Sequence, residues 1–285
     1  MGRSAFPAAA VSPIGKRVSL NGKRHPNGGF TQLRITFLRD GLLQLDAYQP
    51  LPAHAPRHWR DEFIGPEYLA GSAQFILAYL AANSAKPIHL LPRRPFREPK
   101  EASNEIILVR SGLLALYTTD DTGRRQIVAL RYPGEAVLPM ERRLKIGVQP
   151  VVRSEIAAGD ARSFDDAVQD SADFRRLVQQ VVQRNHALAF EWLTNCGLRD
   201  ATSRIAHLIC ETFHRLGVDA ERDVLRSPLT QQLMAQITGQ TAVNVNRVLS
   251  DLERGAIIRR NDREIEALNY PELKRIAGFD PSYLS

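Results

Sequence analysis

The sequence has few cysteines and no long hydrophobic run, and these absences exclude several classes of protein. The 285 residues include two cysteines, Cys196 and Cys210, too few for a disulfide framework, a zinc knuckle or a four-cysteine iron–sulfur site. The longest mostly apolar stretch, residues 69–82, is interrupted by Gly, Ser and Gln. It is shorter than the roughly 20 residues of a membrane-spanning helix. We therefore expect a cytoplasmic protein that does not bind a membrane.

Motifs of common enzyme classes are missing as well. The sequence has no P-loop, dinucleotide glycine fingerprint, Gly-x-Ser-x-Gly elbow or His-Glu-x-x-His, so we predict no cofactor and no enzymatic activity. His207, Glu211 and His214 share one face of an expected helix, where a metal site is the alternative to ordinary polar packing. A cupin-like metal-binding or catalytic barrel with an appended helical domain is the alternative for the whole chain. Against that alternative, residues 104–165 contain no histidine, whereas metal sites in such barrels need two or three.

Positive charge is concentrated near the N-terminus. The net charge is +7 and the pI about 9.7, which is compatible with a nucleic-acid partner. No acidic residue precedes Asp40, glycine and proline punctuate this region, and no helical or strand period persists in it. Residues 1–65 are therefore predicted to be a basic, disordered extension. It could be an arm that touches DNA phosphates, a targeting peptide, or a segment from a start codon assigned too far upstream.

The middle of the chain has the pattern of short β-strands separated by glycine turns. Residues 106–119 and 124–130 are rich in strand-forming residues. Gly112, Gly123 and Gly134 recur at a constant spacing, as successive turns of a small barrel require. We predict a β-barrel domain over residues 66–165.

A helical period begins at Phe174. Apolar or seam-forming residues follow in alternating steps of four and three, which is typical of a coiled-coil seam. We predict a dimerisation helix over residues 166–198; an amphipathic helix packed on its own domain is the alternative. The seam positions are Phe174, Val178, Val181, Asn185, Leu188, Trp192 and Asn195.

The last part of the chain predicts a winged helix-turn-helix over residues 199–280. A helix is expected over 201–216, followed by two short helices, each with a threonine N-cap (Thr230 and Thr241), joined at Gly239. A hairpin with three arginines over 256–265 forms the wing, and a helix over 271–277 closes the domain. The outward face of the second short helix offers Ala242, Val243, Asn246 and Arg247.

These motifs resemble the CRP/FNR family of bacterial transcription regulators. The resemblance lies in the Ser-Gly … Gly … Pro-Gly-Glu pattern of residues 104–135, the Asp-Ala-x-x-Arg-Ile-Ala of 200–206, and residues 229–252. It implies an α+β fold with an N-terminal double-stranded β-helix (cupin-like) sensor barrel, a long dimerisation helix and a C-terminal winged helix-turn-helix. It also implies a sequence-specific regulator that binds double-stranded DNA as a homodimer on a pseudo-palindromic site. RNA polymerase is a further candidate partner, although no motif reveals a surface for it.

The resemblance assigns roles to individual side chains. Arg247 is expected to pair with a guanine edge, and Ala242 and Val243, which replace the Arg and Glu of the best-known members, to contact thymine methyls. Asn246 shares this base-reading face. Hydroxyl, amide and guanidinium groups are expected to bind DNA phosphates. They belong to Thr230, Gln232, Thr241, Asn244, Arg259, Arg260 and Arg263.

The effector pocket departs from the family pattern. Its candidate residues are Gly134, Glu135, Arg142 and Arg143. Cyclic-nucleotide-binding members have a second Gly-Glu and an Arg-Ser/Thr-Ala here, which this chain lacks. The clustered cysteines of the oxygen-sensing branch are missing too. We therefore expect that cyclic AMP does not bind, and the effector is not identified by the sequence.

Overall fold

The computed structural model describes residues 87–101, 104–139, 145–170 and 172–284, together with three strands nearer the N-terminus. The three strands form an antiparallel sheet, although the sequence predicted no strand there. They are β1 (Arg17–Asn21), β2 (Gln32–Phe37) and β3 (Leu43–Leu45). The rest of the predicted basic extension, residues 1–65, lies outside the described residues, so its predicted disorder stays a prediction there.

Seven strands between residues 87 and 160 form two further sheets, called the paired sheets below. The strand orders are β4-β10-β5-β8 and β7-β6-β9. The strands are β4 (Pro87–Leu90), β5 (Glu105–Ser111), β6 (Leu114–Thr119), β7 (Arg125–Arg131), β8 (Ala136–Val137), β9 (Gly147–Pro150) and β10 (Ser154–Asp160). The β-rich region agrees with the prediction. In the part of the chain that is described, however, the strand pairing does not close the two sheets into a barrel.

Glycines with positive φ make the turns between these strands. Gly112, Gly123 and Gly134 have φ values of 87°, 79° and 84°, a region that residues with a Cβ adopt only with strain. The spacing seen in the sequence therefore marks real turns.

Strand β5 is buried on both of its faces. Ile107 and Val109 pack between the two sheets, while Ile106 and Leu108 pack toward the helices. The alternation follows from the two-residue period of a strand, and the continuous apolar run Ile106 to Val109 follows from burial on both sides.

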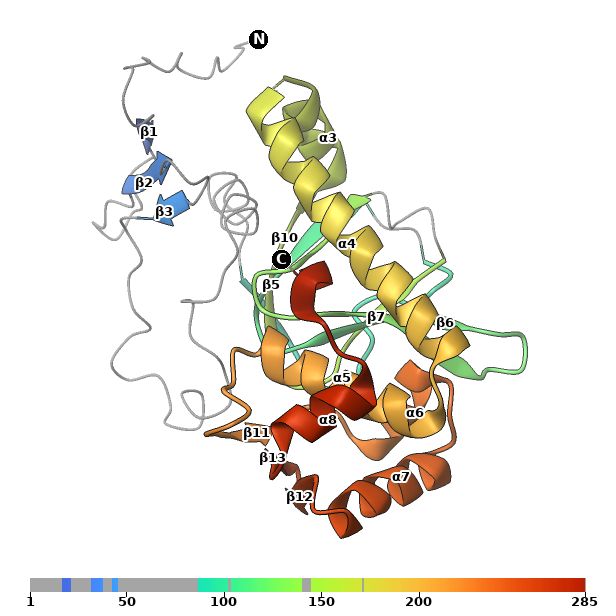
Figure 1. The fold of residues 1–285 in the computed structure, drawn as a ribbon. Coiled ribbons are helices and arrows are strands. Elements are labelled where there is room, and N and C mark those ends of the chain that lie inside the picture. Colours follow the sequence, from blue (N-terminus) through green and yellow to red (C-terminus); the bar gives the residue numbers. More distant parts are fainter. Residues whose placement is uncertain are drawn as a thin grey trace.

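Two helices, α3 (Ala161–Asp170) and α4 (Ala172–Leu198), follow the paired sheets. The predicted seam of α4 faces its own chain. Phe174 is 3% exposed and packs edge-on against Phe164, and Leu188 and Asn195 are buried. These three of the seven seam residues thus pack within the chain, and the dimerisation role of residues 166–198 stays a prediction. Figure 1 shows α4 running from α3 toward the winged domain. Another face of this helix stays open, and it carries the exposed Phe190 and Leu193.

The remaining elements form the winged domain, with helices and wing where the sequence placed them. A third strand, β11, joins the hairpin in the order β11-β13-β12; the sequence analysis missed it. The elements are α5 (Ala201–Arg215), β11 (Val224–Arg226), α6 (Gln231–Thr238), α7 (Ala242–Arg254), β12 (Ile258–Asn261), β13 (Glu264–Ala267), α8 (Tyr270–Ala277) and the short 3-10 helix η3 (Pro281–Leu284). Within the described residues, no helix combines the length and hydropathy needed to span a bilayer.

Candidate nucleic-acid interface

Helices α6 and α7 form a helix-turn-helix whose geometry is set by local caps. The Thr230 hydroxyl accepts a hydrogen bond from the Leu233 N–H, and the Thr241 hydroxyl accepts one from the Asn244 N–H, both at 3.2 Å. Gly239 ends α6 in the left-handed conformation, with φ of 66°. A threonine cap at each start and a glycine at the stop fix where each helix begins and ends.

The inner faces of the two helices pack into the core of the winged domain. Six apolar residues on these inner faces are buried, together with residues of α5. They are Met234, Ile237, Val245, Val248, Leu249 and Leu252. Because these side chains fix the orientation of α7, the opposite face of the helix must point to solvent.

That outer face carries the four predicted base-reading residues, all exposed. Val243 is 82% exposed, so its side chain takes no part in the core of the winged domain. Arg247 is held at the surface by the Asn244 side-chain oxygen, which lies 2.8 Å from its Nη2. The Gln231 amide donates to the Asn246 side chain at 3.1 Å, which links α6 to α7.

Some of the predicted phosphate-binding side chains are exposed, whereas others are already hydrogen-bonded within the protein. Gln232 and Arg263 are exposed. Asn244 is engaged at both ends, since its Nδ2 donates to Gln240 Oε1 at 2.6 Å and its oxygen accepts from Arg247. Its observed contacts therefore position Arg247. The hydroxyls of Thr230 and Thr241 accept from the N–H groups that they cap.

Two of the three wing arginines are ion-paired. Arg259 lies 2.8 Å from Glu266. Arg260 lies 2.5 Å from Glu253, and its hydrogen bond lowers the pKa of that carboxyl group. Arg260 is therefore the least available wing arginine, and Arg263, at the hairpin turn, is the most exposed to an approaching phosphate.

The candidate effector residues are found in a different role or lie outside the described residues. Gly134 makes the turn before β8, and its N–H donates to the Val109 carbonyl at 2.8 Å. The Glu135 side chain is 13% exposed, and its carboxylate lies 2.5 Å from Arg215 of α5 and 3.6 Å from Arg184 of α4. Arg142 and Arg143 lie outside the described residues.

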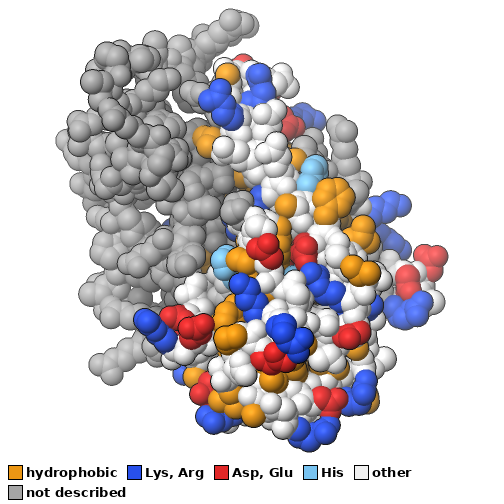
Figure 2. All heavy atoms as spheres, viewed as in Figure 1, with side chains coloured by type: hydrophobic (Ala, Val, Ile, Leu, Met, Phe, Trp, Pro, Cys, Tyr) orange, Lys and Arg blue, Asp and Glu red, His pale blue; other side chains and the backbone are white. Residues whose placement is uncertain are grey.

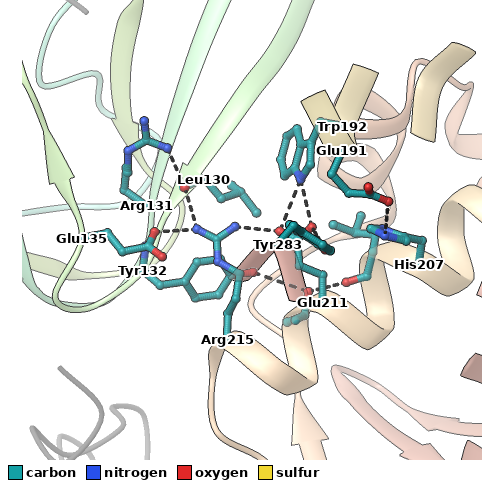
Figure 3. A network of polar contacts seen from close by, with 12 residues as sticks. Leu130, Arg131, Tyr132, Glu135, Glu191, Trp192, His207, Glu211, Arg215 and Tyr283 are labelled. Atoms are coloured by element: carbon teal, nitrogen blue, oxygen red, sulfur yellow. Dashed lines mark hydrogen bonds and ion pairs between the residues drawn. The ribbon is translucent and has the colours of Figure 1, made fainter. Parts of the chain in front are cut away.

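Glu135 belongs to a buried ionic network that joins the paired sheets to the winged domain (Figure 3). The Arg215 side chain is 2% exposed and lies between Glu135 and Glu211. Burial disfavours ionisation of Glu135, but the charges of Arg215 and Arg184 outweigh it, so the pKa of Glu135 lies below its usual value. The network therefore holds ionised groups in the interior.

Glu211 extends this network to two further elements. Its carboxylate accepts hydrogen bonds from Trp192 of α4 and Tyr283 of η3, each at 3.0 Å. His207 lies next to it, 3.1 Å from Glu191, and burial lowers the pKa of the imidazole. Among the described residues no group of three such side chains is placed to hold a metal ion. The histidine and glutamate of α5 therefore pack and pair within the protein.

Sequence reasoning missed the network because Glu135 and Arg215 are far apart in the chain. The sequence contained a partial clue, since Glu211 and Arg215 are four residues apart on the expected helix and can pair. Nothing in the sequence indicated that the turn at Gly134 would meet that helix.

Comparison with known proteins agrees with this geometry. Residues 203–276 match the family model described as the Crp-like helix-turn-helix domain. Residues 203–276 are therefore similar to the winged domain of Crp-like regulators. The resemblance seen in the sequence motifs is thereby confirmed, and the matched residues run from α5 to α8 of the structure.

The similarity to known proteins extends beyond the matched domain. A probable transcriptional activator of Rhizobium leguminosarum bv. viciae is 26% identical over 212 residues, which cover 68% of this chain and 87% of that protein. The transcriptional activator protein FnrL of Cereibacter sphaeroides is 27% identical over 183 residues, covering 60% of this chain and 72% of FnrL. The structure of FixK2 from Bradyrhizobium japonicum has a TM-score of 0.64 at 20% identity and covers 69% of this chain and 98% of FixK2. At that identity the likeness to FixK2 shows the fold alone.

Proposed function

We propose that the chain is a transcription regulator that binds a specific double-stranded DNA site as a homodimer. The exposed outer face of α7 carries this proposal, since it presents an open valine beside an arginine held by Asn244. A helix of this kind fits the major groove of B-DNA. The predicted division into a sensor domain, a dimerisation helix and a winged domain belongs to the same proposal, as does the double-stranded β-helix form of the paired sheets.

Each outer residue of α7 has a role in this proposal. The Arg247 guanidinium donates two hydrogen bonds to a guanine edge, and Ala242 and Val243 contact thymine methyl groups. Asn246 adds an amide to the same face. Backbone N–H groups at the starts of α6 and α7, with Gln232, Arg259 and Arg263, bind phosphates and set the register.

The dimer forms through the open face of α4. Phe190 and Leu193 are each 69% exposed there, three residues apart and therefore on one side of the helix. Apolar side chains gathered along this half of α4 are visible in Figure 2. Two-fold pairing of α4 places the two α7 helices about one helical turn of DNA apart, so the site is pseudo-palindromic.

Cyclic AMP is not the effector in this proposal. The second Gly-Glu of cyclic-nucleotide-binding members is missing from the sequence, and the Glu135 carboxylate pairs with Arg215 inside the protein. Binding of an effector would change the orientation of the two winged domains of the dimer relative to each other, and α4 would transmit that change.

Selection of bound DNA from a random pool at stated salt tests the proposal. We expect two related half-sites whose centres lie about 10 base pairs apart. Recovery of sequences with no shared half-site would contradict it.

Replacing Arg247 with alanine is expected to weaken binding to the selected site by at least about 30-fold, because the dimer loses two bidentate base contacts, each worth about 1–3 kcal/mol. Preference at one position of each half-site should also be lost. Fluorescence anisotropy with point-mutated duplexes measures both. Arg254→Ala is the matched control, since Arg254 is exposed at the far end of the same helix and should leave binding within about twofold. Equal effects of the two substitutions would argue against base reading by Arg247.

Replacing Leu193 with glutamate is expected to convert the dimer to monomers, because the substitution places two like charges at the apolar helix interface. Light scattering after size exclusion measures the mass, and binding to the full site should fall with it. Gln180→Glu, at an exposed position on another side of α4, is the control. A dimer that survives Leu193→Glu would show that α4 does not form the interface.

A further inference from the structure

A series of side-chain hydrogen bonds connects the start of α5 to the outer face of α7. It begins at the carbonyl oxygen of Ala201, the first residue of α5, which accepts from Gln240 Nε2 at 3.3 Å. Gln240 Oε1 accepts from Asn244 Nδ2 at 2.6 Å, and Asn244 Oδ1 accepts from Arg247 Nη2 at 2.8 Å. Two amide side chains, called the amide link below, thus connect the predicted base-reading arginine to another helix of the winged domain.

The direction of every hydrogen bond in the amide link is fixed by its neighbours. Turning an amide side chain by 180° exchanges its donor and its acceptor. The α5 carbonyl at one end can only accept, however, and the guanidinium group at the other end can only donate. The Thr238 hydroxyl donates to the Met234 carbonyl at 2.7 Å, so its oxygen accepts from Gln240 Nε2 at 3.2 Å. Gln240 must therefore present its oxygen to Asn244, and Asn244 must present its oxygen to Arg247.

The anchor of the amide link is held in place by the backbone around it. The Gln240 N–H donates to the Ala235 carbonyl at 3.0 Å. Arg204 of α5 donates from Nη1 to the Thr238 carbonyl at 3.3 Å and from Nε to the Arg199 carbonyl at 2.9 Å. The end of α6 is thus tied a second time to the junction between α4 and α5, and Figure 1 shows these elements close together. Gln240 therefore starts from a fixed position.

At its other end the amide link holds one edge of the Arg247 guanidinium group. The Asn244 oxygen lies 2.8 Å from Nη2 and 3.3 Å from Nε, which share that edge. The edge formed by the two Nη atoms keeps an N–H on each nitrogen. Guanine offers two acceptors, O6 and N7, in the major groove, and this edge can donate to both. Without the link, an exposed arginine would lose more rotamer freedom when it binds the base.

We propose that Gln240 is a positioning residue for base reading, which directs Arg247 toward its guanine through Asn244. The proposal rests on the proposed function, since it takes Arg247 to be the residue that reads the base. Gln240 has no amide hydrogen left for a phosphate, because one is donated to the Ala201 carbonyl and the other to Thr238. Its contribution is therefore to the choice of one base and not to the general affinity for DNA.

The substitution Gln240→Met tests this role, because it removes the amide and keeps the length of the side chain. Anisotropy titrations measure the affinity for the selected duplex and for a duplex in which the guanine read by Arg247 is replaced in both half-sites. That guanine is the position at which Arg247→Ala loses its preference, and the ratio of the two affinities is the base discrimination. Gln236→Met is the matched control, since Gln236 is a half-buried glutamine of α6 outside the amide link.

We expect Gln240→Met to lower the base discrimination by at least about fivefold, because one arginine in each protomer must then be ordered on binding. The preferences at other positions of the half-site and the slope of log affinity on log salt should stay as in the unmodified chain. In the Arg247→Ala background the same substitution should change the affinity by less than about twofold, since its effect passes through Arg247. The control variant should keep the base discrimination.

A second variant, Asn244→Ala, removes the other half of the amide link at a position where alanine favours the helix. It should lower the base discrimination at least as much as Gln240→Met does, and the two substitutions together should lower it no further than Asn244→Ala alone. Thermal unfolding shows that each variant is folded at the temperature of the titrations. The second variant keeps the test valid if Gln240→Met does not fold.

Other results overturn the proposal. Unchanged discrimination in Gln240→Met, or an equal loss in the control, would show that Gln240 does not direct Arg247. An effect of Gln240→Met that persists in the Arg247→Ala background would show that Gln240 acts on the DNA by itself, and an equal loss of preference at every position would indicate a general structural role. If Arg247→Ala leaves the base preferences intact, the proposed function is contradicted instead, and the two failures are thus distinguishable.

Discussion

Replacing Arg215 with methionine is expected to lower the free energy of unfolding by about 3–5 kcal/mol, because it leaves the carboxylates of Glu135 and Glu211 without the cation nearest to each. The Arg215 side chain is 2% exposed and lies 2.5 Å from Glu135 and 2.6 Å from Glu211. Methionine keeps much of the side-chain volume, so the loss of stability reports the charge rather than a cavity.

Urea unfolding of the full chain measures this difference. Arg222→Met is the matched control, since the Arg222 side chain is 83% exposed beside Asp219 and should change stability by less than about 0.5 kcal/mol. The effect of Arg215→Met should also shrink as the pH falls. The pKa of Glu135 is lowered in the folded protein, so its contribution is present above the unfolded pKa of about 4.3 and is lost as the pH falls through the folded value. A destabilisation no larger than that of the control would show that the network does not stabilise the fold.

Replacing Gly112 with alanine is expected to lower the free energy of unfolding by about 3 kcal/mol or more. Gly112 has φ of 87°, and a Cβ there would lie 2.3 Å from Ser154 Oγ and 2.6 Å from the Arg153 carbonyl oxygen. The unfavourable φ and the collision with backbone act together. The Ser154 hydroxyl also accepts a hydrogen bond from the Leu113 N–H at 3.1 Å, which the added methyl disrupts.

Gly123→Ala separates the two causes. Gly123 has a similar φ of 79°, but nothing lies within 4 Å of its added Cβ. This substitution should therefore cost only the conformational strain, about 1–2 kcal/mol. Thermal unfolding of both variants under one set of conditions gives the comparison. Equal destabilisation of the two variants would show that the collision at Gly112 is relieved by a small shift.

Short-range features of this fold were predictable because neighbouring residues determine them. The starts of α6 and α7 follow from Thr230 and Thr241, whose hydroxyls bond three residues ahead. The stop of α6 follows from Gly239. The outer face of α7 follows from the helical period that buries Val245 and Val248.

The partner of α4 was not predictable in this way. The period of its sequence identifies an apolar stripe but does not say which surface covers it. The structure covers Phe174 and Leu188 with the chain's own core, and it leaves Phe190 and Leu193 open. The position of the paired sheets therefore decides which face of α4 packs against the chain's own core and which face is open to solvent.

The sequence by itself determined the caps, the glycine turns, the order of the elements and the residues that face outward on α7, since all of these depend on contacts within a few residues. Only the tertiary structure decided that Glu135 pairs with Arg215 and that Gln240 reaches the start of α5. Such contacts join segments far apart in the chain, and no local period or cap encodes which surfaces meet when the domains pack.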